Sequence, residues 1–212
     1  MKFDMHVHTR YSARCGYMTP KKLSEIAIDN GLDGLAITDH NTIEGALELV
    51  DLVKDEQISL AVIVGEEITT DRGEVLAYFI KSAITAGPFE EVMGEIKLAG
   101  GVSAIPHPFD RIRGGFKGLE EVIRDIDAIE VLNSRCIFNR DALDFCVSHK
   151  KKMLGGSDAH FYSEVGRAWT EFTEGTRKCL LEEQAQVGGG LSNPVYLALT
   201  KGLKMWRKAN SN

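Results

Sequence analysis

The sequence predicts an α/β fold in which about seven strands form a closed or nearly closed barrel. Apolar runs alternate with helix-like segments, which is typical of a parallel sheet with helical connections. The runs are rich in Val, Ile and Leu and alternate only weakly with polar residues, as expected for strands buried on both faces. The length suits one large domain, so we expect residues 1–212 to form a single unit.

The predicted elements follow one another along the chain. We expect strands at Lys2–His8, Gly34–Thr38, Leu60–Ile68, Glu74–Ile80, Val102–Pro106, Ala128–Leu132 and Met153–Gly156. We expect helices at Pro20–Asn30, Ile43–Asp55, Phe89–Ala99, Leu119–Asp125, Ile137–Lys150, Thr176–Val187 and Pro194–Lys208. Thr19 before Pro20 indicates a helix start, and Asn41 with Glu44 forms a capping-box pattern. The last helix carries basic residues that are interpreted as complementing the helix dipole, namely Lys201, Lys204, Arg207 and Lys208.

Composition limits the classes of protein to which the chain can belong. A net charge of −6 argues against an extended nucleic-acid track, although bound metals could attract a small phosphorylated substrate. No apolar run approaches the ~20 residues of a membrane span, and the first residues lack a signal core. We therefore expect a cytoplasmic protein without a membrane partner. Four cysteines without a C-x-x-C pair indicate reduced thiols rather than a disulfide framework.

Metal-binding side chains recur where the predicted strands end. Five of the six histidines lie at or just beyond a carboxyl end: His6, His8, His40, His107 and His160. Carboxylates share this placement at Asp39, Glu66, Glu67 and Asp158. In a parallel barrel these ends converge on one mouth, so the sequence predicts two or three divalent ions there, as Zn, Mn or Fe. Period-two geometry places His6 with His8 and, if the strand persists, Asp158 with His160. Asp39 points away from His40 and is expected to orient a ligand.

Several motifs also carry a family resemblance. HVHTRYS, GLDGLAITDHNT, GEE, IPHPF and GSDAH resemble, in this order, the motifs of the polymerase-and-histidinol-phosphatase (PHP) superfamily of metal-dependent phosphoesterases. The resemblance implies a distorted TIM-like (β/α)₇ barrel with a trinuclear metal centre. It also implies that metal-activated water hydrolyses a phosphomonoester of a small molecule or nucleotide.

The resemblance implies ligand sets for the first two metals. The first metal would take His6, His8, Asp158 and a bridging Glu67; a shifted register would make Glu66 the bridge instead. The second metal would take Glu67, His107 and one more ligand. The family often supplies a histidine on the next strand, but RGEVLAYFI contains none. Glu74 is the best substitute there, unless it is simply a carboxylate at a strand edge in water.

The third metal would take His40, His160 and a residue after H-x-H-T-x-x-S. The family usually has Asp or His at that position, whereas SARCG offers Cys15. A thiolate is a good ligand for borderline metals such as Zn. The alternative is a free loop thiol beside a weak or empty third site.

Catalysis and phosphate binding extend this set of residues. Glu67, between two ions, would hold their spacing, and Asp158 is counted with it among the catalytic residues. His160 or Asp39 could assist proton transfer. Arginines in the expected mouth loops suit phosphate, namely Arg10, Arg14, Arg111, Arg113 and Arg135, of which Arg135 is the preferred contact. The loop HPFDRIRGGFKG either closes on substrate or is a solvated loop.

Three other functions remain open beside a small-molecule phosphomonoesterase. One is an exonuclease that releases nucleotides from the ends of short RNA or DNA. Another is a non-catalytic regulatory module that retains the fold. The third is a non-phosphate hydrolase on a similar metal barrel, since such enzymes also carry His-x-His on the first strand. The sequence predicts neither the physiological substrate nor the oligomeric state.

Overall fold

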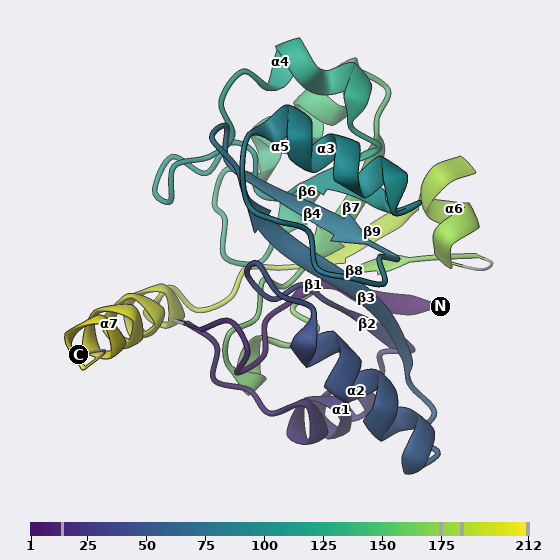
Figure 1. Cartoon of the computed structure of the whole chain (residues 1–212), viewed down its shortest axis with the longest axis vertical. Helices are drawn as coiled ribbons and strands as arrows, with labels where there is room; N and C mark the ends of the chain where they lie inside the picture. The colour runs from purple at the N-terminus through teal and green to yellow at the C-terminus, as the bar shows by residue number, and fades with distance from the viewer. Residues whose placement is uncertain (14, 174–175, 183–184, 211–212) are drawn as a thin grey trace.

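The computed structural model describes residues 1–13, 15–173, 176–182 and 185–210. Within these ranges nine strands form one sheet in the order β7-β6-β5-β4-β3-β2-β1-β8-β9 (Figure 1). The strands are β1 (Lys2–Val7), β2 (Gly34–Ile37), β3 (Ala61–Thr69), β4 (Glu74–Tyr78), β5 (Val102–Ile105), β6 (Ala128–Asn133), β7 (Lys152–Gly156), β8 (Ala168–Glu171) and β9 (Gln186–Gly189). All seven predicted strands are present.

The sheet curls until its β7 edge meets β1 and β8, which gives the nearly closed barrel that the sequence predicts. The His8 amide donates to the Ala159 carbonyl at 3.0 Å. The Thr170 hydroxyl on β8 bonds to the amide of Gly155 at 2.8 Å and to its carbonyl at 3.0 Å. Glycine is required at the neighbouring position because a Cβ on Gly156 would lie 2.5 Å from the His6 Cβ.

Apolar side chains from most of the strands meet in one central cluster. It includes Phe3 and Met5 of β1, Leu76 and Tyr78 of β4 and Leu154 of β7, all almost fully buried. The Tyr78 hydroxyl donates to the Met5 carbonyl at 2.9 Å, so its buried polar atom is satisfied. The barrel is therefore a packed core that supports the strand ends.

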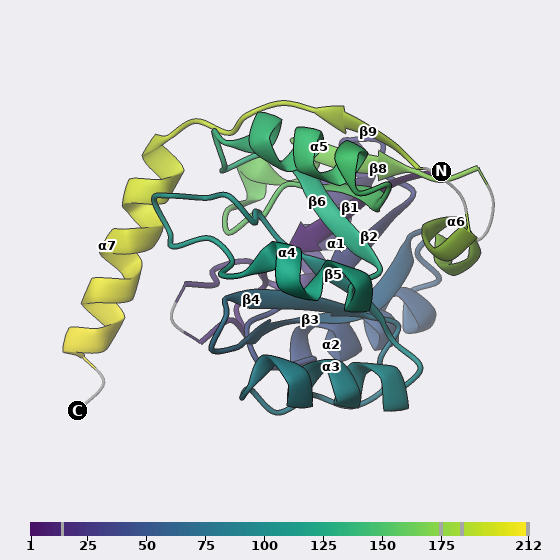
Figure 2. The ribbon, with the colours of Figure 1, turned by 90° about the horizontal axis from the view of Figure 1, so that it is seen from above.

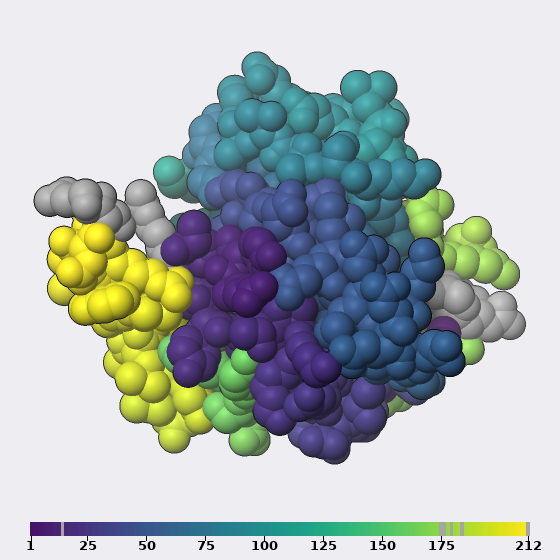
Figure 3. Space-filling view, turned by 60° about the horizontal axis from the view of Figure 1, so that its bottom comes forward, coloured from purple at the N-terminus to yellow at the C-terminus, as the bar shows by residue number. Residues whose placement is uncertain are grey.

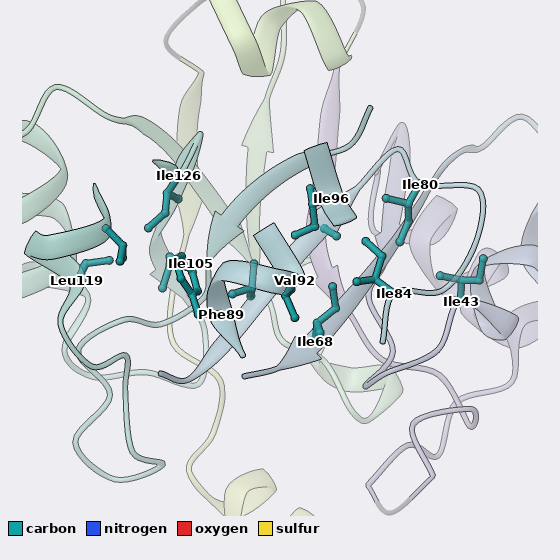
Figure 4. Close-up of a cluster of buried hydrophobic side chains, with 13 residues drawn as sticks. Ile43, Ile68, Ile80, Ile84, Phe89, Val92, Ile96, Ile105, Leu119 and Ile126 are labelled. Atoms are coloured by element: carbon teal, nitrogen blue, oxygen red, sulfur yellow. The ribbon is translucent and has the colours of Figure 1, made fainter. Parts of the chain in front are cut away.

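Helices cover the outside of the barrel. They are α1 (Pro20–Asp29), α2 (Glu44–Asp55), α3 (Phe89–Leu98), α4 (Leu119–Val122), α5 (Asn139–Ser148), α6 (Thr176–Glu182) and α7 (Val195–Ala209). Figure 4 shows α3 presenting Phe89, Val92 and Ile96 to Ile68 of β3 and Ile105 of β5. Figures 1 and 2 show α7 beside the barrel, at the end opposite the N-terminus of β1. No helix in the described ranges has the length and apolarity that crossing a membrane requires.

Several expectations about the elements are wrong. The sheet is not wholly parallel, because β4 runs antiparallel to both β3 and β5. Only residues 70–73 separate β3 from β4, and so short a connection can join only antiparallel strands. Of the helix expected over Thr176–Val187, Thr176–Glu182 is helical and residues 183–184 lie outside the described residues. Its last residues, from Gln186, belong to β9, which pairs with the equally unexpected β8.

The predicted capping box at Asn41 does not form. Helix α2 begins at Glu44 with Ile43 as the N-cap, and no side chain caps it. The Asn41 side chain instead accepts a hydrogen bond from the Thr69 amide at 2.9 Å. It therefore ties the end of β2 to the end of β3 rather than starting the helix. The start of α1 agrees with the prediction, since Thr19 precedes Pro20, although the Thr19 hydroxyl makes no capping bond.

Candidate metal centre

The predicted metal ligands converge at the mouth where β1, β2, β3, β5 and β7 end. β4 contributes through its first residue, Glu74, because its antiparallel direction brings its amino end to the same mouth. The short β3–β4 connection that breaks the parallel pattern thus supplies a carboxylate to the cluster. Residues separated by up to 154 positions, from His6 to His160, meet within this one site.

Glu67 lies at the centre of the cluster. One of its oxygens, Oε2, is 3.4 Å from His6 Nε2, 3.3 Å from His8 Nε2 and 3.0 Å from His40 Nδ1. Its other oxygen, Oε1, is 3.4 Å from His107 Nε2 and has no hydrogen-bond partner among the described residues. A carboxylate that reaches four imidazoles has the position that a bridging ligand needs.

Glu66 points away from the cluster. Its Oε2 accepts a hydrogen bond from the Ile84 amide at 2.8 Å, on the opposite face of β3. Burial raises the pKa of this carboxyl to about 7. The position of Glu66 favours the register in which Glu67, and not Glu66, contacts the histidines.

The ligand atoms form three compact groups. The first contains His6, His8 and Asp158, where His8 Nε2 is 3.3 Å from Asp158 Oδ1. The second contains His40, Glu67 and Glu74, and His107 Nε2 lies 3.7 Å from Glu74 Oε2 beside it. The third contains His8, His40 and His160. The grouping resembles the ligand sets inferred from the sequence, with histidines shared between neighbouring groups.

Cys15 lies next to the third group. Its side chain is buried and hydrogen-bonded to His40, and its amide donates to the Ser12 carbonyl at 3.1 Å. Among the described residues, the compact group around His40 and His160 takes His8 as its third member instead of Cys15. The thiol is therefore within reach of one predicted ligand of the third metal, without being part of that group.

Glu130 is a functional residue that the sequence reasoning missed. Its Oε1 lies 3.0 Å from His6 Nδ1, and its Oε2 accepts bonds from the His107 amide and from Asn133 Nδ2, both at 2.9 Å. A carboxylate at Nδ1 fixes the proton there and leaves Nε2 free to bind a metal. The signal in the sequence was a single acid inside the apolar strand AIEVLN, where an unpaired charge would be costly.

His8 is oriented by a chain of hydrogen bonds through Ser12 to Asp39, as His6 is by Glu130. The Ser12 hydroxyl donates to Asp39 Oδ1 at 2.7 Å and lies 3.1 Å from His8 Nδ1, so it accepts the imidazole proton. Both oxygens of Asp39 are also bound by Thr9, each at 2.6 Å. The structure therefore places Asp39 behind a ligand, as the expected orienting role requires, and not beside the proposed reaction centre.

Backbone conformation, rather than strand geometry, brings Asp158 into the cluster. β7 ends at Gly156, and Asp158 has a left-handed φ of 55°, while His107 has a φ of 29°. The strand does not persist to Asp158, so the period-two relation with His160 that depended on it does not apply, although both side chains reach the site. Non-glycine residues in this region are strained and are often found at functional sites.

Charge and burial set the protonation of the imidazoles. Burial opposes protonation of His6 and His40, but the neighbouring acidic groups, of which Glu67 contributes most, together outweigh it and raise both pKa values, that of His40 to about 10. Burial lowers the pKa of His8 to about 3 and holds that of His160 well below its ordinary value. Burial would raise the pKa values of Glu67 and Asp158, but neighbouring positive charge keeps both low. His6 is the main such neighbour of Glu67, and Arg113 is that of Asp158. Neutral imidazoles and ionised carboxylates are the forms that bind metals.

The arginines expected to contact phosphate have different positions. Arg113 reaches the cluster, where its guanidinium bonds to Asp158 and Asp110. Arg135 lies within the site, but its guanidinium donates to other protein groups. It bonds to Glu164 at 2.7 Å and to the Thr200 hydroxyl of α7 at 2.8 Å. It also lies 3.1 Å from His160 Nδ1. Of the two, Arg113 has the more accessible guanidinium, with 26% of its side chain exposed against 2%.

The remaining arginines lie outside the cluster. Arg10 pairs with Glu48 at 2.9 Å and Arg111 pairs with Asp141 at 3.1 Å, both in exposed positions. Arg14 lies outside the described residues. The loop that follows His107 folds around Asp110, which accepts bonds from the Ile112 and Arg113 amides and so aims Arg113 at Asp158.

A cleft of about 460 Å³ opens directly onto the cluster. One side is lined by His40, Glu74, Arg113, Arg135 and His160, and the other side is formed by α7. The donor set of imidazoles and carboxylates fits Zn, Mn or Fe, and the buried, unpaired Oε1 of Glu67 is an atom that such an ion would satisfy. The residues present therefore fit a metal centre with room for a small ligand beside it.

Comparison with known proteins agrees with this geometry. Family models match as "PHP domain" over residues 4–104 and as "PHP-associated" over residues 137–183. Two uncharacterized proteins of Methanocaldococcus jannaschii are similar to this chain. MJ1587 is 34% identical over 68% of this chain and 86% of its own length. MJ0417 is 33% identical over 82% of this chain and 71% of its own length. A two-domain protein of Bacteroides vulgatus that contains a predicted PHP-like metal-dependent phosphoesterase superposes with a TM-score of 0.73 at 20% identity, over 95% of this chain and 69% of that one.

Proposed function

The chain belongs to the PHP family of metal-dependent phosphoesterases, and from this premise we propose that it hydrolyses phosphomonoesters of small molecules or nucleotides. The observation that supports the proposal most strongly is the contact of Glu67 with His6, His8, His40 and His107. Such a bridge fits a centre of two or three ions. The adjoining cleft has the size of a small-molecule site.

The three groups of ligand atoms supply candidates for each ion. His6, His8 and Asp158 would hold the first, and Glu67, Glu74 and His107 the second. His40 and His160 would hold the third, with His8 or Cys15 completing it. Bound ions of this kind supply a water of lowered pKa and positive charge for the phosphoryl oxygens.

The side chains around the ligands would set orientation and charge. Glu130 keeps the proton of His6 on Nδ1, and Asp39 acts through Ser12 to keep that of His8 on Nδ1. Both relays leave an Nε2 lone pair directed at Glu67 and Asp158. Arg113 is the side chain that would donate to a phosphoryl oxygen, since its guanidinium already binds a carboxylate at that point.

The proposal is tested by phosphate release from metal-stripped protein reloaded with Zn²⁺, Mn²⁺ or Fe²⁺. The panel should include sugar phosphates, nucleotides and short oligonucleotides. We expect turnover of at least one phosphomonoester that is lost in Asp158→Asn and strongly reduced in Arg113→Ala. Arg140→Ala is the matched control, because Arg140 is exposed and pairs with Asp144 on the outer helix α5, away from the cluster. No phosphate release with any metal across the panel would refute the proposal.

A further inference from the structure

Helix α7 forms one wall of the cleft beside the metal centre. Figure 3 shows α7 (yellow) against the N-terminal segment (purple), and Arg207 donates to the Ala13 carbonyl at 3.4 Å. The helix presents one face to the cleft, through Leu197, Ala198, Thr200, Lys201 and Lys204. Their spacing of three and four residues is that of a single helical face. This wall therefore belongs to the binding site, although the sequence motifs do not include it.

The helix dipole does not account for the two lysines of this wall. The dipole acts within the last turn of a helix, and in α7 that turn contains Arg207 and Lys208. Lys201 lies in the middle of the helix, which runs from Val195 to Ala209, and Lys204 lies more than one turn from its end. The interpretation made from the sequence therefore fits Arg207 and Lys208, while Lys201 and Lys204 need another explanation.

Helix α7 gives this wall a positive charge. The sequence of α7 contains four basic and no acidic residues, in a chain whose net charge is −6. Among the described residues neither Lys201 nor Lys204 has an ion-pair partner, whereas Arg113 and Arg135 in the same cleft are paired with carboxylates. The two lysines are therefore the cations of the cleft that remain available to an anionic ligand.

The cleft therefore brings two sets of anion-binding side chains to one space. His40, His160 and Arg113 belong to the part that would take the reacting phosphoryl group. Lys201 and Lys204 of α7 line the same space, together with the apolar Ile112, Leu197 and Ala198. A volume of about 460 Å³ has the size of a small-molecule site.

We propose that Lys201 and Lys204 bind a second anionic group of the substrate, so that the preferred substrate is a small phosphomonoester carrying a phosphate or carboxylate at its other end. This inference rests on the proposed phosphoesterase function and adds the substrate class. Arg135 supports the wall as a positioning residue, since it bonds to the Tyr196 carbonyl at 3.2 Å and to the Thr200 hydroxyl at 2.8 Å.

The test compares two synthetic substrates that differ only in the second anion. Butane-1,4-diol bisphosphate and 4-hydroxybutyl phosphate are assayed with metal-loaded protein, and the ratio of their kcat/KM values is determined. We expect the wild type to favour the bisphosphate at least about fivefold. In the double variant Lys201→Ala/Lys204→Ala the ratio should fall to about two, the statistical value for two equivalent phosphates. Lys208→Ala, on the same helix outside the cleft, should keep the wild-type ratio.

A wild-type ratio near two, or one that survives the double substitution, would overturn the inference. A 5′-phosphorylated hexanucleotide that is preferred over the bisphosphate would also overturn it, in favour of a nucleic-acid end. If neither substrate is hydrolysed with any metal, the proposed function fails, and binding then decides the role of the lysines. Calorimetric titration with butane-1,4-bisphosphonate should show at least about fivefold weaker binding to the double variant, whereas equal affinity would refute the lysine site.

Discussion

Replacing Glu130 by glutamine tests whether the residues behind the ligands control the metal centre. The carboxylate receives three donors: the His107 amide and Asn133 Nδ2 at Oε2, and His6 Nδ1 at Oε1. A glutamine has one acceptor oxygen, and two donors hold it on the Oε2 side. Its NH₂ group then faces His6 Nδ1 at about hydrogen-bond distance, so His6 must carry its proton on Nε2, the nitrogen directed at Glu67.

The magnitude follows from the loss of that ligand nitrogen. Partners behind a metal-binding histidine typically contribute 10- to 100-fold in metal affinity, which corresponds to about 1.4–2.8 kcal/mol. We expect Glu130→Gln to weaken metal binding by about this factor in a competitive titration with a coloured chelator, and to lower phosphate release in proportion.

Glu66→Gln provides the matched control for this experiment. Glu66 is equally buried and also lies on a strand of the barrel, but it bonds to the Ile84 amide away from the cluster. Its metal affinity should stay within about twofold of the wild type. Unchanged affinity in a folded Glu130→Gln protein, or an equal loss in Glu66→Gln, would refute the reasoning.

Three further predictions follow from the same geometry. Cys15→Ala should lower the bound metal by about one ion per chain in elemental analysis if the thiolate completes the third site, and unchanged content would exclude that role. Gly156→Ala should lower the free energy of unfolding by about 1–3 kcal/mol in urea denaturation, since the new Cβ would lie 2.7 Å from the backbone nitrogen of His6. Gly94→Ala is the control and should not destabilise the protein, because the space around Gly94 is open. Metal loading at pH 7 should release protons, because His6 and His40 have raised pKa values and must be neutral to bind a metal. Metal affinity should therefore fall as the pH falls. Calorimetric binding heats that do not depend on the ionisation enthalpy of the buffer would contradict this prediction.

Sequence reasoning located the barrel and the cluster of histidines and carboxylates at its mouth because both depend on local patterns. Apolar runs identified the seven strands, and the histidines at their carboxyl ends had to meet once the strands ran in parallel. Strand direction was missed, although the four-residue connection before the antiparallel β4 contains Asp71 and Gly73, which are typical of a hairpin turn. The consequence was that Glu74, at the beginning of β4, could not be distinguished from a carboxylate in water.

Contacts between distant segments explain what the sequence left out. Glu130 reads as one acid in an apolar strand until the closure of the barrel brings its side chain within 3.0 Å of His6 on β1. Arg135 was expected to bind phosphate, but it lies between η2 (Tyr162–Glu164) and α7, and its donors are taken by Glu164 and Thr200. Lys201 resembled a dipole-complementing charge until the packing of α7 placed it on the cleft.

The central claim is that the histidines and carboxylates at the barrel mouth hold the ions of a phosphoesterase. X-ray diffraction at the absorption edge of the loaded metal, from crystals of the reconstituted protein, tests it most directly. The account predicts two or three anomalous peaks around Glu67, one of them ligated by His6, His8 and Asp158. The absence of any peak within ligand distance of Glu67, in protein saturated with Zn²⁺, Mn²⁺ or Fe²⁺, would contradict it.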